Sequence, residues 1–355
     1  MLSDELLFIK VFYEVLWVIL LFQIIISFCQ HSALHLKIHI WNNFFSVILI
    51  VYASFYLGTR EAIAHTDTGV YIEYYNYLTT SFDFWNYGEP IFYFLMALFA
   101  HYFPVEYFFT FCAFVYIGGA YICMKRFFSS SAIYSLLLFF ISPFFFLYGI
   151  NGIRNGFAAS LFLLSLYWLN RNNKKMYTLM IAASLCHYSM FIVLLVFILS
   201  KYIKSNFALL CIWGGVLLLY LINIRFSSFL GGIFNINESA ENYLMTKSDD
   251  PSASLMNFFT YSASPVFLSC FFIYVKKYKD TIYLRLLNMY IILNIFYILV
   301  MDIQFAVRFS YLSGFLMPIV LVYPLIKVRI IPLRLWILSL FLAGIFLIKS
   351  SKILF

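Results

Sequence analysis

Long apolar runs recur along the whole chain, and they constrain its fold more than any other feature of the sequence. Each run is about 16 to 24 residues long, close to the length that a helix needs to cross ~30 Å of hydrocarbon. Charged residues make up only 11% of the 355 residues, whereas a soluble domain carries about 25%. No alternation with a ten-residue period is present, which argues against an outer-membrane barrel. The sequence therefore predicts an all-α, polytopic integral membrane protein.

The apolar runs predict about ten to twelve transmembrane helices in a single domain, residues 1–355. We expect spans at roughly 6–28, 40–58, 88–103, 105–123, 131–149, 153–169, 177–200, 206–224, 258–275, 282–300, 309–326 and 334–349. The first span is acidic at its start and is followed by no small-residue cleavage site, so it is not typical of a cleaved signal. The two long polar connections, 59–87 and 225–257, are predicted to be outer loops.

Lysine and arginine in short loops indicate the orientation of the chain. Basic residues at 125–126, 171–175, 276–279 and 327–334 are typical of cytoplasmic loops. With these loops inside, Arg154 lies at the outer face, and 225–257 does so only if 177–200 is re-entrant or paired half-helices. Charge alone does not fix the topology of 59–126, for which we prefer partial insertion of 88–103. The formal net charge of +8 marks the cytoplasmic loops and gives no reason to expect nucleic acid as a partner.

Charged residues interrupt the apolar sequence at a few places only. Arg154 lies in "YGINGIRNGFAASL", between two apolar runs, and an arginine at the bilayer centre costs ~2.5–3.5 kcal/mol. It therefore lies at the water interface or faces a cavity that uses its charge. The other candidate side chains are Arg60, Asp67, Tyr71, Glu89, Asn155, His187, Ser189 and Arg308.

Each of these residues also has a purely structural explanation. Arg60 and Asp67 can be solvated loop residues, and Glu89 can be an acid that the helix dipole favours at a helix N-terminus. Arginines near helix ends, such as Arg308, can extend to the headgroups. His187, in the middle of a span, can be a hydrogen-bonded packing residue between helices.

The same residues together suit one kind of chemistry. Arginine binds phosphate oxygens in a bidentate manner and stays charged, and a carboxylate or histidine can take the proton of a hydroxyl. Such a set fits displacement of a sugar from a lipid pyrophosphate, with arginines stabilising the leaving group. The polar stretches hold no Asp-x-Asp motif or metal-ligand cluster, so we expect a metal-independent reaction with no cofactor.

The order of these motifs resembles that of the EpsG family of bacterial polysaccharide polymerases, the Wzy-type polymerases. That family shows a Gly-x-Arg…Gly-x-Asp…Tyr stretch, a Glu-Pro-Gly-Phe-like stretch, an Ile-Arg-Gln helix start and then a His-x-Ser within an apolar run. In this chain His65 stands two residues before Asp67 where glycine is usual, and "GEPIF" replaces the Glu-Pro-Gly-Phe form. The resemblance covers about residues 50–200 by motif, and Asn155 stands where glutamine is usual. The matching positions are Gly58, Arg60, Asp67 and Tyr71; Glu89 and Pro90; Ile153, Arg154, Asn155 and Ala158; and His187 and Ser189.

The resemblance implies a multi-pass enzyme of the bacterial inner membrane whose active site faces the periplasm, with a fold of the GT-C kind. It would move a growing glycan from undecaprenyl pyrophosphate onto the terminal sugar hydroxyl of a new lipid-linked repeat unit, with a chain-length regulator as a further partner. Arg154 and Arg308, with Arg60 as a third, would hold the pyrophosphate. Asp67, Glu89 or His187 would be the base, and Tyr71, Asn155 and Ser189 would support them.

Two other functions remain open from the sequence. An O-antigen ligase uses the same donor but usually carries a larger periplasmic loop than 225–257. A transporter or flippase of lipid-linked oligosaccharide would also need arginines in a cavity, and it should show paired broken helices in internal repeats. We find no convincing repeat in this chain.

Overall fold

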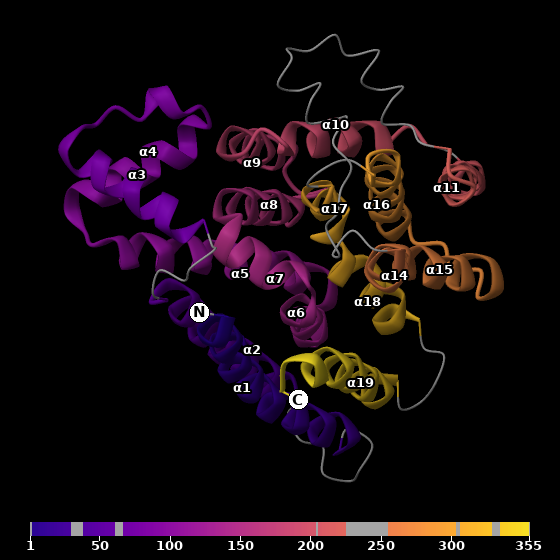
Figure 1. Cartoon of the computed structure of the whole chain (residues 1–355). Helices are drawn as coiled ribbons and strands as arrows, with labels where there is room; N and C mark the ends of the chain where they lie inside the picture. Colours follow the sequence, from indigo (N-terminus) through magenta and orange to yellow (C-terminus); the bar gives the residue numbers. More distant parts are fainter. Residues whose placement is uncertain are drawn as a thin grey trace. The chain divides into compact units, whose positions relative to one another are not determined.

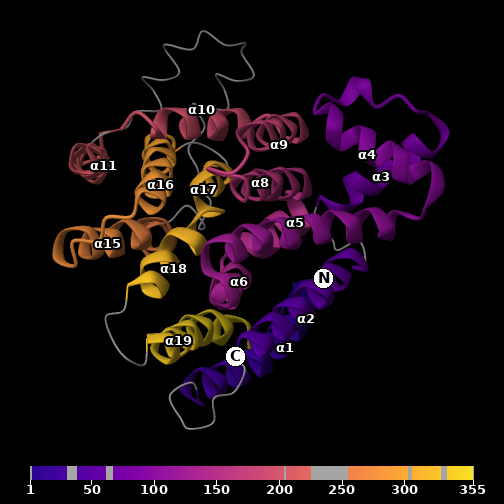
Figure 2. The same cartoon turned by 180° about the vertical axis from the view of Figure 1, so that it is seen from behind.

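The computed structural model describes residues 2–29, 38–60, 67–203, 205–224, 255–302, 306–328 and 334–354. These residues form helices joined by short turns, and no β-strand occurs among them (Figures 1 and 2). Six of the described segments are long and apolar enough to cross a membrane: Leu7–Cys29, Ile38–Gly58, Val105–Ile141, Phe258–Val275, Thr281–Leu299 and Val307–Lys327. The predicted all-α polytopic membrane class is confirmed. Most of the predicted loop 225–257 and residues 61–66 of 59–87 lie outside the described residues.

The chain divides into two compact units, Met1–Phe191 with Leu325–Phe355 and Ile192–Pro324. The helices of the first unit are α1 (Leu2–Cys29), α2 (Ile38–Gly58), α3 (Thr68–Thr80), α4 (Pro90–Tyr102), α5 (Val105–Phe128), α6 (Ala132–Ile141), α7 (Phe144–Phe146), α8 (Ile153–Leu166), α9 (Asn173–Cys186) and α19 (Arg334–Leu354). A 3₁₀ turn, Trp85–Tyr87, precedes α4, and a π-helical turn, Leu147–Asn151, precedes α8. α10 (Met190–Ser200) and α18 (Met317–Lys327) lie where the chain passes between the units.

Small residues allow α8 to pack closely against α5 in the first unit. A Cβ at Gly119 on α5 would lie 2.8 Å from the backbone oxygen of Ser160 on α8, so only glycine fits there. The Ser160 hydroxyl donates to the backbone oxygen of Tyr116 across the same contact. α8 also packs against α9 (Figures 1 and 2), and this pairing brings the start of α8 and the end of α9 into one region.

Amide side chains hold the helices of the second unit together. This unit contains α11 (Asn206–Leu221), α14 (Leu255–Asn257), α15 (Ser264–Cys270), α16 (Thr281–Leu299) and α17 (Val307–Gly314), with π-helical turns at Phe258–Ala263 and Phe271–Val275. Asn206 Nδ2 donates to Asn288 Oδ1 over 2.6 Å, and Trp213 Nε1 donates to Asn294 Oδ1 over 2.7 Å. Both bonds join α11 to α16, and interhelical hydrogen bonds of this kind stabilise packed membrane helices.

Three of the predicted spans are each divided into two helices. The segment 131–149 breaks at Ser142 and Pro143, because proline has no N–H to continue α6. The segment 177–200 breaks at residues 187–189 into α9 and α10, and 309–326 breaks at residues 315–316 between α17 and α18.

The predicted loop 59–87 contains a helix, α3, that the sequence analysis did not foresee. Its buried residues Tyr71, Tyr75 and Leu78 recur at helical spacing, which is the period of an amphipathic helix. The polar residues between these three positions hide the pattern from an analysis based on hydropathy.

Candidate functional site

Glu89 is set in place by an unusual backbone conformation. Gly88 has φ +64° and ψ −167°, a region that is essentially restricted to glycine, and Glu89 follows in the left-handed region with φ 41°. α4 then begins at Pro90, whose fixed φ suits a first turn. The Glu89 side chain makes no capping hydrogen bond to α4. It is therefore more than an acid favoured by the dipole of its own helix, and its carboxylate is directed elsewhere.

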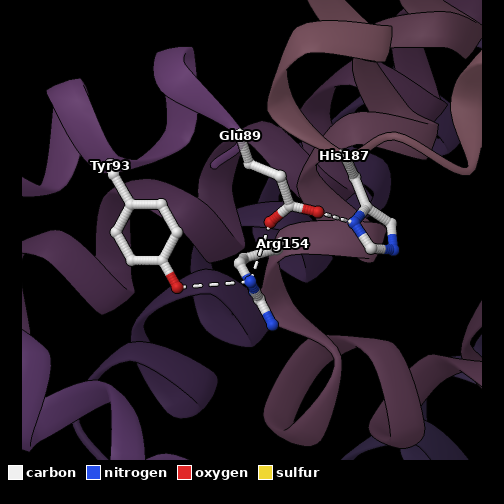
Figure 3. A network of polar contacts seen from close by, with 4 residues as sticks. All are labelled: Glu89, Tyr93, Arg154 and His187. Carbon is white, nitrogen blue, oxygen red and sulfur yellow. Dashed lines mark hydrogen bonds and ion pairs between the residues drawn. The ribbon is translucent and has the colours of Figure 1, made fainter. Parts of the chain in front are cut away.

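Arg154 is the second residue of α8, directly after the π-helical turn. A Cβ at Gly156 would lie 2.3 Å from the backbone oxygen of Tyr148, so glycine is needed for this turn to fold onto the helix start. A cation at a helix N-terminus is unfavourable, because that end of the helix dipole is positive. Arg154 Nη1 meets this cost by donating to Glu89 Oε2 over 2.8 Å, and it also donates to the Tyr93 hydroxyl over 3.2 Å (Figure 3).

His187 is the residue at which α9 ends. Its N–H donates to the Ala183 oxygen over 3.1 Å, and its own oxygen accepts from Met190 N over 3.0 Å as α10 begins. His187 Nδ1 pairs with Glu89 Oε1 (Figure 3). A carboxylate oxygen can only accept, so Nδ1 carries the proton in this pair, and the second ring nitrogen, Nε2, lies on the side away from Glu89.

Glu89 is the buried centre of this three-residue cluster. The side chain of Glu89 is 9% exposed, while those of Arg154 and His187 are 34% and 25% exposed. Burial raises the pKa of Glu89, but the hydrogen bond and charge of His187 and the charge of Arg154 together lower it below its ordinary value. The carboxylate is thus ionised at neutral pH. The guanidinium and the imidazole both remain partly accessible.

Two tyrosines flank the guanidinium of Arg154. The Arg154 Cζ atom lies 5.7 Å from the ring centroid of Tyr93 on α4 and 5.9 Å from that of Tyr71 on α3. Burial raises the pKa of Tyr71 against the opposing charge of Arg154, so its hydroxyl stays neutral. Tyr71 was among the residues predicted from the sequence, and Tyr93 was not. The available signal was spacing, since Tyr93 follows Glu89 by four residues and so shares its helix face.

Several polar atoms close to the cluster in sequence are buried without a partner within the described part of the chain. They are Asn151 Oδ1, Arg154 Nε, Asn155 Oδ1 and Ser189 Oγ. An unpaired buried polar atom costs about 1–3 kcal/mol, and native proteins keep few of them. Asn155 is 8% exposed and adjoins Arg154, while Ser189 is two residues from His187. These atoms fit a site that binds a polar ligand.

The other two candidates of the first unit are Arg60 and Asp67. Arg60 is 6% exposed, and its guanidinium donates to the backbone oxygen of Leu57, to Thr68 Oγ1 over 3.3 Å and to the Ile150 oxygen over 3.5 Å. Asp67 is exposed immediately before α3 and makes no capping hydrogen bond. Among the described residues, no hydrogen bond or ion pair joins Arg60 or Asp67 to Glu89, Arg154 or His187.

Arg308 lies on α17 in the second unit, where it is exposed. The cluster of Glu89, Arg154 and His187 belongs to the first unit.

The model of the EpsG family matches residues 43–354, which is nearly the whole chain. The chain belongs to the EpsG family. The predicted resemblance is thus confirmed, and the match extends well beyond the motif region of about residues 50–200. EpsG proteins are Wzy-like polymerases, so membership supports a polysaccharide polymerase in general. No curated protein and no solved structure matches the chain.

In this EpsG protein the three motifs that meet are the Glu-Pro stretch, the Ile-Arg helix start and the His-x-Ser break. They join a guanidinium, a buried carboxylate and an imidazole whose second ring nitrogen, Nε2, lies on the side away from Glu89. In the described ranges, no three His, Cys, Asp or Glu side chains come together as a metal ion would require. The cluster can bind an anionic group at Arg154 and move a proton at His187.

Proposed function

We propose that this EpsG protein transfers a growing glycan from undecaprenyl pyrophosphate onto the terminal sugar hydroxyl of one new lipid-linked repeat unit. The reaction would take place at the periplasmic face of the bacterial inner membrane. One observation supports this proposal most strongly: the single buried carboxylate of Glu89 holds a guanidinium on one oxygen and an imidazole on the other. An anion-binding group and a proton acceptor are thereby fixed next to each other.

Arg154 serves the donor substrate in this proposal. Its side chain is one-third exposed, and its Nε has no partner in the described structure. The first N–H groups of α8 also have no partner within the helix, and they lie at the positive end of the helix dipole. Guanidinium and helix start together stabilise the negative charge that gathers on the pyrophosphate as it leaves. Arg308 is proposed as a second pyrophosphate ligand on charge alone.

His187 serves the acceptor substrate. The acceptor hydroxyl oxygen forms a bond to the anomeric carbon of the donor sugar while the bond from that carbon to the pyrophosphate oxygen breaks. The electron pair leaves with undecaprenyl pyrophosphate, and the hydroxyl proton passes to His187 Nε2. Glu89, hydrogen-bonded to Nδ1, holds the ring in place and stabilises the imidazolium that forms. Glu89 and Asp67 were equal candidates for the base, but Glu89 is already engaged at both oxygens.

The test is the banding pattern of surface polysaccharide in a deletion strain that carries wild-type or variant protein. Arg154→Ala and His187→Ala are compared with Arg171→Ala and His101→Ala, because Arg171 and His101 are exposed residues of the same types. All proteins must be present in the membrane at equal level. We expect a ladder from the wild type and both controls, and single repeat units from the deletion and both cluster variants.

Other outcomes would contradict the proposal. If the deletion strain shows no surface unit at all, the missing step is flipping or ligation rather than polymerisation. If Arg154→Ala and His187→Ala both give full ladders, the cluster stabilises the fold and is not the reaction site.

A further inference from the structure

Tyrosine rings extend outward from the cluster of Glu89, Arg154 and His187. Tyr93, which accepts from Arg154, stacks on Tyr87 with ring centroids 4.9 Å apart and planes at 24°. Tyr74 on α3 meets Tyr87 edge-on at 5.1 Å, and Tyr77 meets Tyr87 edge-on at 6.3 Å. These rings hold one another, so a molecule that binds at the cluster would meet a rigid aromatic surface.

A further aromatic side chain, that of Tyr188, lies next to the Gly88 turn. Tyr188 directly follows His187 and is 52% exposed. A Cβ at Gly88 would lie 3.6 Å from Tyr188 Cε2 and 3.7 Å from its hydroxyl oxygen, so this ring contacts the turn that carries Glu89. Gly88 itself is exposed and has no side chain. Tyr87 directly precedes Gly88, and Tyr188 directly follows His187 and lies next to Gly88. Both tyrosines are therefore close in the chain to Glu89 or His187.

The exposed rings of this region alternate with polar side chains. Trp85 is 72% exposed and Tyr77 is 51% exposed, and neither lies in a segment long and apolar enough to cross a membrane. Exposed Glu73 and Asn76 come shortly before Tyr77 in the sequence, and exposed Asp83 lies between Tyr77 and Trp85. A sugar presents an apolar C–H face and a rim of hydroxyl groups, so it needs both flat rings and hydrogen-bonding side chains. Lipid tails would not favour the carboxylates.

We propose that Tyr87 and Tyr188, extended by Tyr77 and Trp85, form the subsite for the acceptor saccharide. This inference rests on the proposed function, since it assigns the sugar that approaches His187. The terminal sugar of the lipid-linked repeat unit stacks against Tyr188 over the bare Gly88 turn and presents its hydroxyl to His187. The further sugars of the unit lie along Tyr87 toward Trp85.

The test is acceptor kinetics with the full-length protein in lipid nanodiscs. The acceptor is the lipid-linked single repeat unit purified from the deletion strain, and it is varied at fixed donor concentration. We expect Tyr188→Ala to raise the acceptor KM roughly tenfold with little change in kcat, because stacking is lost while the cluster remains. Tyr188→Phe keeps the ring and should stay near wild type. The matched control is Tyr102→Ala, which removes a 68% exposed ring at the far end of α4.

An acceptor KM in Tyr188→Ala equal to that of Tyr102→Ala would overturn the subsite. So would a loss of thermal stability in lipid at an unchanged KM, since the ring would then belong to a membrane-interface belt.

A binding measurement separates failure of the subsite from failure of the proposed function. The probe is the repeat unit freed from its lipid, titrated against tryptophan fluorescence, with Trp85→Phe identifying the Trp85 signal. If the wild type binds this saccharide through Tyr188 yet makes no polymer, the subsite stands and the proposed function fails. If polymer forms and binding does not depend on Tyr188, the subsite alone is wrong.

Discussion

Arg60 and Arg154 occur in the same short sequence pattern, but Arg60 lies at the C-terminal end of α2 and Arg154 lies at the N-terminal end of α8. Both follow a glycine by two residues, in Gly58-Thr59-Arg60 and Gly152-Ile153-Arg154. Arg60 comes just after α2 ends, and its guanidinium turns back to the backbone oxygen of Leu57. Arg154 comes just as α8 begins, where the helix offers N–H groups and no carbonyl. Helix polarity thus decides which partners each arginine needs.

We expect from this difference that Arg60 stabilises the fold and that Arg154 is available to bind a ligand. Arg60 joins the end of α2 to Thr68 and Ile150, and its Cζ atom lies 4.6 Å from the ring centroid of Phe109. Burial lowers its pKa to about 10, against the opposing effects of Cys112 and Tyr71, so it remains charged at neutral pH. Arg154 instead needs an anion, and Glu89 supplies one while leaving the guanidinium one-third exposed.

The sharpest way to break this comparison is Arg154→Ala. We expect the initial polymerisation rate in nanodiscs to fall about 10²–10³-fold, since the leaving pyrophosphate loses its fixed cation. The thermal midpoint should stay near wild type, because the side chain is partly exposed and His187 still pairs with Glu89. Arg171→Ala controls for loss of an exposed arginine. An unfolded Arg154→Ala protein would reverse the roles that we assign to the two arginines.

Arg60→Ala should show the opposite behaviour. Removing the guanidinium leaves buried carbonyl oxygens unpaired, so we expect the free energy of unfolding to fall by on the order of 3 kcal/mol. The measurement is the thermal midpoint and the monodisperse fraction on size-exclusion chromatography in detergent. A protein with wild-type stability and no activity would instead favour Arg60 as the third pyrophosphate ligand, as the sequence pattern suggests.

Gly88→Ala sharpens the account of how Glu89 reaches Arg154. The backbone conformation of Gly88 is strained for any other residue, by about 1–3 kcal/mol. We expect kcat to fall roughly tenfold because the carboxylate shifts relative to His187. Gly69→Ala is the matched control, since a Cβ there meets nothing within 4 Å. Equal kinetics for the two variants would show that the left-handed turn does not position the carboxylate.

The smallest effect concerns the pH dependence of stability. The pKa of Glu89 in the folded protein is below the ordinary value of 4.5, so the unfolded chain binds the proton more readily. The ion pair therefore stabilises the fold above pH 4.5, and this contribution is lost as pH falls through the lower, folded pKa. Against Glu89→Gln, we expect an advantage of about 0.5–1 kcal/mol at pH 7 that shrinks on acidification. An advantage that grows in acid would contradict the assigned direction.

The fold was predictable to the extent that apolar length determines it. Runs long enough to cross a bilayer identified the helices, but breaks within a run depend on local chemistry such as Pro143 or the turn at His187. α3 escaped because its buried face consists of tyrosines spaced among polar residues. A hydropathy average does not identify such a helix, whereas the helical spacing of its buried residues does.

The candidate site was predictable as a set of residue types and not as a set of contacts. Glu89, Arg154 and His187 were all named from the sequence. Arg154 and His187 lie 65 and 98 residues from Glu89 along the chain, so only tertiary packing joins the three. The pattern also could not distinguish Arg60 from Arg154, because the direction of the neighbouring helix decides. The roles of all these residues, with Asp67 and Arg308, remain predictions.

The most direct test of the central claim measures lipid pyrophosphate release together with chain growth in reconstituted vesicles. Wild type, His187→Ala and the control His101→Ala are supplied with lipid-linked repeat units. We expect one undecaprenyl pyrophosphate to be released per repeat unit added by wild type and control, and a rate at least about 100-fold lower for His187→Ala. Release and growth at the wild-type rate in His187→Ala would contradict it, because the proton acceptor would then lie elsewhere.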